Sequence, residues 1–315
     1  MTIILLLLGL GLIVLGANSL VEGASGIARR AGVSEFAIGL TIVGFGTSCP
    51  ELVVSLTGAI QGNADIAVGN VIGSNIFNTL FILGLTSLLY PVAMTDANRK
   101  SDIPIALIAT VMLLVFGMFP RFAGNGGSIS RIEGLLFMAA FAFYVFFAFR
   151  TSGKDTGPES PRAERPVPAS ILMAILGLAG LVGGGELFVR SATRLAGQMG
   201  VSDKFIAVTV LAGGTSLPEL ATSLVAALKG RPQLALGNIL GSNVFNILFI
   251  LGSSALIMPL SFASVTIVDA AMLLLSSVLL VLCAYTGRKL RIDRFEGAAM
   301  LAVFAAYYIY LFNKL

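Results

Sequence analysis

Two glutamates inside long apolar stretches are the residues of this chain best suited to chemistry. Glu51 ends the hexapeptide GTSCPE at 46–51, and Glu219 ends the similar hexapeptide GTSLPE at 214–219. No Lys or Arg lies in the central part of these apolar segments to pair with them, and an unpaired carboxylate in a medium of low dielectric constant is costly. Each glutamate therefore needs a proton or a metal cation, and such a residue is a functional candidate by default.

The residues just before each glutamate predict a break in a helix. A proline removes a backbone N–H and clashes with the carbonyl four residues earlier, which here belongs to a glycine. The residues of the two breaks are Gly46, Pro50, Gly214 and Pro218. Thr47 and Thr215 precede the glutamates by one turn and share a helix face with them. Carbonyl, hydroxyl and carboxylate oxygens favour Ca²⁺ or Na⁺ over zinc or copper.

A second motif, GNVIGSNIFN at 69–78, returns as GNILGSNVFN at 237–246. Its serine and final asparagine are four residues apart and share a helix face; these residues are Ser74, Asn78, Ser242 and Asn246. Its glycines allow a neighbouring helix to approach closely. We expect these helices to pack against the broken ones and complete the coordination shell. A purely structural role, in which buried amides and hydroxyls join helices, stays open.

Both motifs belong to an internal repeat. Residues 32–92 align without gaps onto 200–260, and roughly half of the positions are identical. The alignment extends weakly upstream, where 9–32 lies over 177–200. The identities concentrate on polar residues inside apolar segments, which packing alone would not preserve.

Composition places the chain in a lipid bilayer. It is 57% hydrophobic and 11% charged, whereas soluble domains carry about 25% charged residues. At about 20 apolar residues per span, the sequence predicts about ten spans. They are 3–27, 33–60, 66–90, 103–119, 132–149, 169–196, 201–228, 234–259, 263–285 and 295–312.

The expected fold is an all-α membrane protein with about ten transmembrane helices in two inverted five-helix repeats. The first repeat is 1–150, a polar linker is 151–168, and the second repeat is 169–315. An odd number of spans per unit inverts the second unit, as in secondary transporters, whose site lies at the midplane.

Charge predicts the orientation. Most of the 20 Lys and Arg residues fall in loops on one side, which favours both termini outside and the 151–168 linker in the cytoplasm of a cell membrane. Asn18 and Glu186 occupy equivalent places in the first span of each half, with Glu22 near the end of that span. We interpret these three residues as vestibule or packing residues.

Several classes of protein fit poorly. The chain has no histidine, only two cysteines, and a net charge of +4 that is spread over loops rather than clustered as for nucleic-acid binding. An intramembrane enzyme would need a poised base or a metal-bound water, and the chain has no histidine to provide either. We therefore expect that the protein is not an enzyme and uses no cofactor. A cation channel also needs oxygen rings, but inverted repeats with broken helices favour a transporter. The expected functional unit is a monomer.

The paired motifs GTSCPE…GNVIGSN and GTSLPE…GNILGSN resemble the alpha-1 and alpha-2 repeats of the calcium/cation antiporter superfamily. The likeness is closest to prokaryotic sodium/calcium exchangers and covers nearly the whole chain. It implies exchange of Na⁺ for Ca²⁺ by alternating access, in which the first and sixth helices slide across the rest.

The resemblance also implies ligands. Ca²⁺ would bind Glu51 and Glu219 with oxygens of Thr47 and Thr215. Na⁺ would use the same glutamates together with further hydroxyls and carbonyls, and two asparagines would complete the centre. Those residues are Ser48, Ser74, Ser216, Ser242, Gly44, Ala212, Asn78 and Asn246.

One position departs from part of the family. Some relatives carry Asp where this chain has Asn246, so the site holds only two acids and potassium dependence is not expected. If three Na⁺ exchange for one Ca²⁺, as the resemblance implies, one net charge moves per cycle. Exchange of Ca²⁺ for H⁺ at the same glutamates remains the alternative, because carboxylates alone can carry protons.

Overall fold

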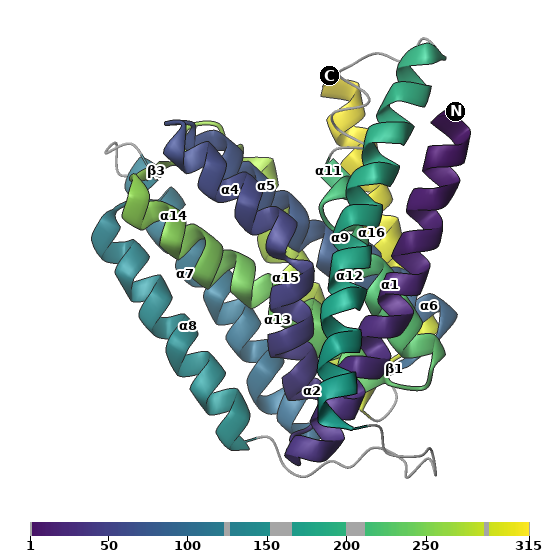
Figure 1. Cartoon of the computed structure of the whole chain (residues 1–315). Coiled ribbons are helices and arrows are strands. Elements are labelled where there is room, and N and C mark those ends of the chain that lie inside the picture. The colour runs from purple at the N-terminus through teal and green to yellow at the C-terminus, as the bar shows by residue number, and fades with distance from the viewer. Residues whose placement is uncertain (1, 123–126, 152–165, 200–211, 287–289, 315) are drawn as a thin grey trace.

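The computed structural model describes the chain except residues 1, 123–126, 152–165, 200–211, 287–289 and 315, and the described part is almost entirely helical (Figure 1). The first half contains α1 (Thr2–Ala31), α2 (Glu35–Ile38), η1 (Gly39–Val43), α3 (Gly44–Thr47), α4 (Cys49–Ile60), α5 (Ala64–Ile76), η2 (Phe77–Ile82), α6 (Leu83–Leu89), β1 (Val92–Ala93), η3 (Asn98–Asp102), α7 (Ile103–Phe122), β2 (Ser128–Ile129) and α8 (Arg131–Thr151). The second half contains α9 (Val167–Gln198), α11 (Ala212–Gly214), α12 (Leu217–Leu228), α13 (Pro232–Val244), η5 (Phe245–Ile250), α14 (Leu251–Ile257), β3 (Leu260–Ser261), α15 (Ile267–Thr286), β4 (Arg291–Ile292) and α16 (Arg294–Lys314).

Eight described helices are long and apolar enough to cross a membrane, and one bent pair, α2–α3 with α4, makes a possible ninth span. These coincide with nine of the ten predicted segments. The remaining segment, 201–228, lies partly outside the described residues, and its described part contains α12. Most of the predicted linker 151–168 also lies outside them, so a count of ten remains a prediction.

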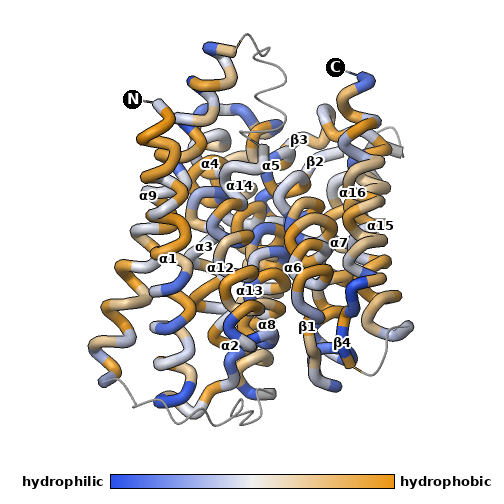
Figure 2. Tube along the Cα trace, turned by 90° about the vertical axis from the view of Figure 1, so that its right-hand side faces the viewer, coloured by the Kyte–Doolittle hydropathy of each residue, from blue (hydrophilic) through white to orange (hydrophobic). Residues whose placement is uncertain are grey.

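The two spans that carry the second motif form the centre of the molecule. In the span made of α13, η5 and α14, 94% of the residues in the most apolar 18-residue stretch are buried. In the span made of α5, η2 and α6, the corresponding share is 72%. The peripheral helices expose large apolar side chains such as Leu15, Ile132 and Phe143, which suits contact with lipid. Figure 2 shows hydrophobic residues along the outer helices α1 and α16.

α1 and α9 lie side by side at one edge of the molecule (Figures 1 and 2). Glycines make this close approach possible. A Cβ on Gly16 would lie 2.6 Å from the backbone nitrogen of Leu181, and one on Gly177 would lie 2.4 Å from that of Leu20. Small residues let helices in lipid pack backbone to backbone, so α1 and α9 form a tightly joined pair.

Four two-residue strands, which the sequence did not predict, tie the two halves together. β1 pairs antiparallel with β4 through Val92 and Ile292, and β2 pairs antiparallel with β3 through Ile129 and Leu260. β1 and β3 follow equivalent helices, so the two ribbons are equivalent. They lie at opposite ends of the molecule (Figure 2), whereas both chain ends lie at one end (Figure 1). This is the arrangement expected if the second half is inverted relative to the first.

Each central span contains a π-helical stretch at the final asparagine of the second motif. Asn78 lies in η2 and Asn246 in η5. Sequence reasoning did not predict these stretches. Such turns are rare and occur often at functional sites, and here they widen both central helices at matching positions.

Candidate cation-binding site

The structure interrupts the helices within both hexapeptides, in each case at a serine. The first broken helix bends by 50° between α3 and α4, at Ser48, whose φ and ψ are −83° and 9°. Ser216 precedes α12 with nearly the same angles, −88° and 8°. Pro50 and Pro218 fall in the first turn of the following helix, where the missing N–H has no partner in any case.

The breaks bring the two glutamates into one buried cluster. The Ser48 hydroxyl donates to Oε1 of Glu219 at 2.7 Å, and the Ser216 hydroxyl donates to Oε1 of Glu51 at 2.9 Å. All four side chains are 0% exposed. Each acid is therefore held by a serine from the other half of the chain, which links the two halves through their most costly buried groups.

The second motif approaches the same cluster. The hydroxyl of Ser74 lies 3.4 Å from Oε1 of Glu51, and that of Ser242 lies 3.4 Å from Oε1 of Glu219. Ser242 also lies 3.3 Å from the Gly44 carbonyl oxygen, which places that carbonyl beside the acids. For Ala212, at the start of α11, the structure gives no such carbonyl contact among the described residues, and its role stays a prediction.

Close helix approach through the second motif is confirmed for its later copy. A Cβ on Gly237 would lie 2.3 Å from the Phe36 carbonyl oxygen, and one on Gly241 would lie 2.3 Å from that of Leu40. Side chains at these two positions would push the broken helix away. The glycines thus allow Ser242 to reach the site.

Several buried oxygens of the predicted ligand residues have no hydrogen-bond partner among the described residues. They are Oε2 of Glu51, Oε2 of Glu219, Oδ1 of Asn78, Oδ1 of Asn246 and Oγ1 of Thr215. Buried polar atoms are nearly always partnered, and each exception calls for an explanation. Carboxylate, amide and hydroxyl oxygens are the ligands that Ca²⁺ and Na⁺ prefer. No cluster of three or more His, Cys, Asp or Glu occurs in the described part of the chain.

Thr47 differs from its counterpart Thr215. It is 0% exposed, and its hydroxyl lies 3.1 Å from Oδ1 of Asn238 and 3.4 Å from the Gly44 carbonyl oxygen. Thr215 is partly exposed, and its hydroxyl has no hydrogen-bond partner among the described residues. The two predicted threonine ligands therefore have different environments in this conformation.

Sequence reasoning missed a bridge of amides between the two central spans. Asn246 donates from Nδ2 to Oδ1 of Asn75 at 3.0 Å, and Asn75 donates to the Asn243 carbonyl at 3.1 Å. Asn243 in turn donates to the Thr79 hydroxyl at 2.8 Å. The repeated GSN tripeptide was the signal for it, but only the packing shows that these asparagines bond across the halves.

Asn70 and Asn238 were also missed as site residues, although both stand in the repeated GN dipeptide. Asn70 Nδ2 lies 3.1 Å from the Glu51 backbone carbonyl, and Asn238 Nδ2 lies 3.3 Å from that of Glu219. Each asparagine thus holds the backbone of one glutamate.

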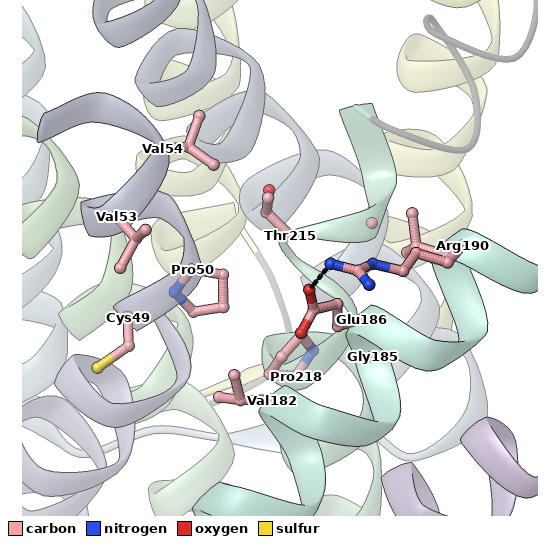
Figure 3. Close-up of a pocket in the computed structure, with 12 residues that line it drawn as sticks. Cys49, Pro50, Val53, Val54, Val182, Gly185, Glu186, Arg190, Thr215 and Pro218 are labelled. Atoms are coloured by element: carbon pink, nitrogen blue, oxygen red, sulfur yellow. Dashed lines mark hydrogen bonds and ion pairs between the residues drawn. The ribbon is translucent and has the colours of Figure 1, made fainter. Parts of the chain in front are cut away.

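A cavity of about 440 Å³ leads toward the site from one side, between α4, α9 and α12. Figure 3 shows Glu186 and Arg190 of α9 facing Pro50 and Val53 across the space, with Thr215 between them. Glu186 and Arg190 form an ion pair within α9. The interpretation of Glu186 as a vestibule residue agrees with this position, but its role is untested.

The equivalent route past α1 is closed. Ala17 and Val21 of α1 are 0% exposed, whereas Gly185 and Val189 at the equivalent positions of α9 line the cavity. Glu22 of α1 pairs with Lys229, which follows α12, at 3.0 Å, and thereby ties α1 to the other half. A second ion pair, Arg231 with Glu35, lies nearby in sequence and crosses the same halves. Among the described residues, the site is thus approached past α9 and is covered on the side of α1.

The fold and site together define a multi-pass helical membrane protein with a buried centre of hard oxygen donors. Comparison with known proteins agrees. The chain matches the family described as sodium/calcium exchanger protein over residues 1–150 and 169–313. It is 40% identical to a putative antiporter, CaxA, of Alkalimonas amylolytica, over 99% of this chain and 98% of that protein. It is 33% identical to the sodium/calcium exchanger MaX1 of Methanosarcina acetivorans, over 98% of both chains.

Solved structures lead to the same group. The chain superposes on the sodium-calcium exchanger NCX_Mj, soaked without Na⁺ and Ca²⁺, with a TM-score of 0.84 and 33% identity, covering 100% of this chain and 99% of that one. The chain therefore belongs to the sodium/calcium exchanger family, whose members are cation antiporters rather than enzymes.

Proposed function

We propose that this protein exchanges Na⁺ for Ca²⁺ across a cell membrane by alternating access, with Glu51 and Glu219 as the charged ligands. The observation that carries the proposal is the buried pair of glutamates. Each is bonded to a serine of the opposite half, and each has one oxygen without a partner among the described residues. A buried unpaired charge is costly. A cation between the two acids removes that cost.

Charge balance indicates how two kinds of ion can compete. Two carboxylates neutralise one Ca²⁺, with the hydroxyl oxygens of Thr47 and Thr215 as neutral ligands. Na⁺ ions would be distributed over the same carboxylates and the neutral oxygens around them. Those oxygens belong to Ser48, Ser216, Ser74, Ser242, Gly44, Ala212, Asn78 and Asn246. Because both ions need the same two acids, occupancy by one displaces the other.

Alternating access follows from the unequal sides of the site. The cavity reaches Thr215 past α9, while α1 covers the equivalent approach to Thr47. α1 and α9 pack backbone to backbone, so they can shift as one unit. Such a shift would close one approach as it opens the other. We further propose ten spans in two inverted repeats, 1–150 and 169–315, with both termini outside and the 151–168 linker cytoplasmic, and a monomeric functional unit.

The experiment is uptake of ⁴⁵Ca²⁺ into proteoliposomes that contain the purified protein. An outward Na⁺ gradient should drive uptake, and dissipation of that gradient with a sodium ionophore should stop it. Uptake driven by a pH gradient alone, with none driven by Na⁺, would replace sodium by protons as the counter-ion at the same glutamates. Rapid Ca²⁺ flux without any counter-ion would instead indicate a channel.

A further inference from the structure

The two asparagines that hold the glutamate backbones have a second contact each, on the same helix as the glutamate. Nδ2 of Asn70 lies 3.0 Å from the Ser55 hydroxyl, and Nδ2 of Asn238 lies 2.8 Å from the Ser223 hydroxyl. The Glu51 carbonyl is an acceptor only, so the amide nitrogen must face it. Both amide protons are then used, and the amide oxygen of each asparagine remains free to accept another hydrogen bond.

The two amide oxygens are used differently in this conformation. Oδ1 of Asn238 accepts from the hydroxyl of Thr47, at 3.1 Å, on the side that α1 closes. The equivalent donor for Asn70 is Thr215, whose hydroxyl has no partner among the described residues and which lines the open cavity. The hydrogen bond therefore exists where the approach to the site is closed and is missing where it is open.

We propose that Asn70 and Asn238 are positioning residues for the two glutamates, and that their amide oxygens bond Thr215 and Thr47 alternately, each only while its own side is closed. The amide nitrogens hold the glutamate backbones in both states. The amide oxygens tie the threonine of the opposite repeat when the approach closes. This inference rests on the proposed function only for the identity of the ion. The alternation of the two hydrogen bonds depends on which side of the site is open and not on which ion is bound.

The test compares Asn70→Leu with Asn238→Leu, which remove the amide but keep a branched side chain with the same number of non-hydrogen atoms. Each is combined with Val21→Cys, a reporter on the closed side, in a chain that also carries Cys49→Ser and Cys283→Ser. Asn238→Leu removes a bond of the conformation described above, so labelling of Val21→Cys by a maleimide should become faster. One buried hydrogen bond predicts an increase of about threefold to tenfold. Asn70→Leu removes a bond of the opposite conformation and should not increase this labelling.

Binding of ⁴⁵Ca²⁺ to the purified protein is the second readout and needs no transport. Both variants should weaken Ca²⁺ binding severalfold, because both release a glutamate backbone. Ser55→Ala and Ser223→Ala keep the hydrogen bond from the asparagine to the glutamate carbonyl and should weaken Ca²⁺ binding less. If the leucine variants fail to fold, Asn70→Ser and Asn238→Ser, which lose the reach of the amide, should show the same contrast more weakly.

The outcomes separate the two parts of the proposal. Equal labelling of Val21→Cys in both asparagine variants, or no change in either, overturns the alternating hydrogen bonds. Unchanged Ca²⁺ binding in both overturns the positioning role. A wild-type protein that binds Ca²⁺ but does not exchange it for Na⁺ contradicts the proposed function and leaves the asparagine comparison intact.

Discussion

At the scale of residues, the arrangement of Glu51 and Glu219 is unusual because neither acid is paired with a cationic side chain among the described residues around it. Each has one oxygen held by a serine of the other half and one without a partner. Serine hydroxyls stabilise a carboxylate only in part, because the desolvation cost of a fully buried charge amounts to several kcal/mol. The arrangement therefore favours a bound cation or a proton at each acid.

Replacing either glutamate should abolish transport. Glu51→Gln or Glu219→Gln keeps the size and the serine contact but leaves one charge for a divalent ion, so we expect Ca²⁺ uptake to fall to the background of empty liposomes. The measurement is ⁴⁵Ca²⁺ uptake into proteoliposomes. The control is Asp65→Asn, an exposed acid bonded to Ser264, which should keep wild-type uptake. Retained transport in either glutamine variant would refute the proposed site.

At the scale of elements, α1 and α9 are the pair whose common movement would open and close the site. Their contact depends on glycines, since side chains there would collide with the facing backbone. Both helices expose much of their remaining surface, and only 28% of the residues in the most apolar 18-residue stretch of each helix are buried. The pair is thus tight within itself and loosely covered from outside, which suits a unit that moves against a fixed core.

Bulk at the α1–α9 contact should destabilise the protein. Gly16→Val would force Cβ against the backbone of Leu181 and Gly177, and overpacking of this kind costs about 1–3 kcal/mol. The melting temperature in detergent should fall. Gly11→Val on the same helix is the matched control, because a Cβ there meets nothing within 4 Å. Equal loss in both variants would show that the cost belongs to valine in this helix rather than to the contact.

At the scale of the whole molecule, two sequence-equivalent sides adopt different conformations. The cavity opens past α9 at the site, while α1 covers the other side and is tied down by the ion pair of Glu22 and Lys229. Arg190 of α9 is the residue equivalent to Glu22 of α1. It pairs with Glu186 of its own helix. Among the described residues, the ion pair from α1 to the other half therefore has no counterpart from α9.

Equivalent positions on the two sides should differ in reactivity. Val189 lines the cavity and Val21 is fully buried, so a membrane-impermeant maleimide should label Val189→Cys and leave Val21→Cys nearly unlabelled. Both variants carry Cys49→Ser and Cys283→Ser. Labelling from each face of the vesicle identifies the face on which the cavity opens. Similar labelling rates for the two positions would contradict the one-sided conformation.

Exchange should also respond to membrane potential. If three Na⁺ move against one Ca²⁺, one net charge crosses per cycle, which corresponds to about 2.3 kcal/mol per 100 mV. One net positive charge leaves the vesicle in each cycle of Na⁺-driven Ca²⁺ uptake. A potassium diffusion potential, negative outside the vesicle, should therefore speed this uptake, and the opposite polarity should slow it. Rates that do not depend on potential would indicate electroneutral exchange of two monovalent ions for each Ca²⁺.

Much of this protein could be predicted from local features of the sequence. The apolar segments predict the spans because a lipid bilayer demands about 20 apolar residues from each. The glycines and prolines at 46–50 and 214–218 predict the breaks because their backbone effects are local, and the repeat identifies Glu51 and Glu219 as equivalent acids. The two-residue strands and the π-helical stretches carried no comparable local signal.

Tertiary structure decided the rest. Only the packing of the two halves shows that Ser48 bonds Glu219 rather than its own neighbour Glu51, and that Asn70 and Asn238 reach the glutamate backbones, because these contacts join segments far apart in the chain. The open side was also beyond sequence reasoning. Two similar repeats support two equivalent conformations, and one chain adopts one of them at a time. The sequence therefore determines the site, while the packing of α1 and α9 determines the side from which it is reached.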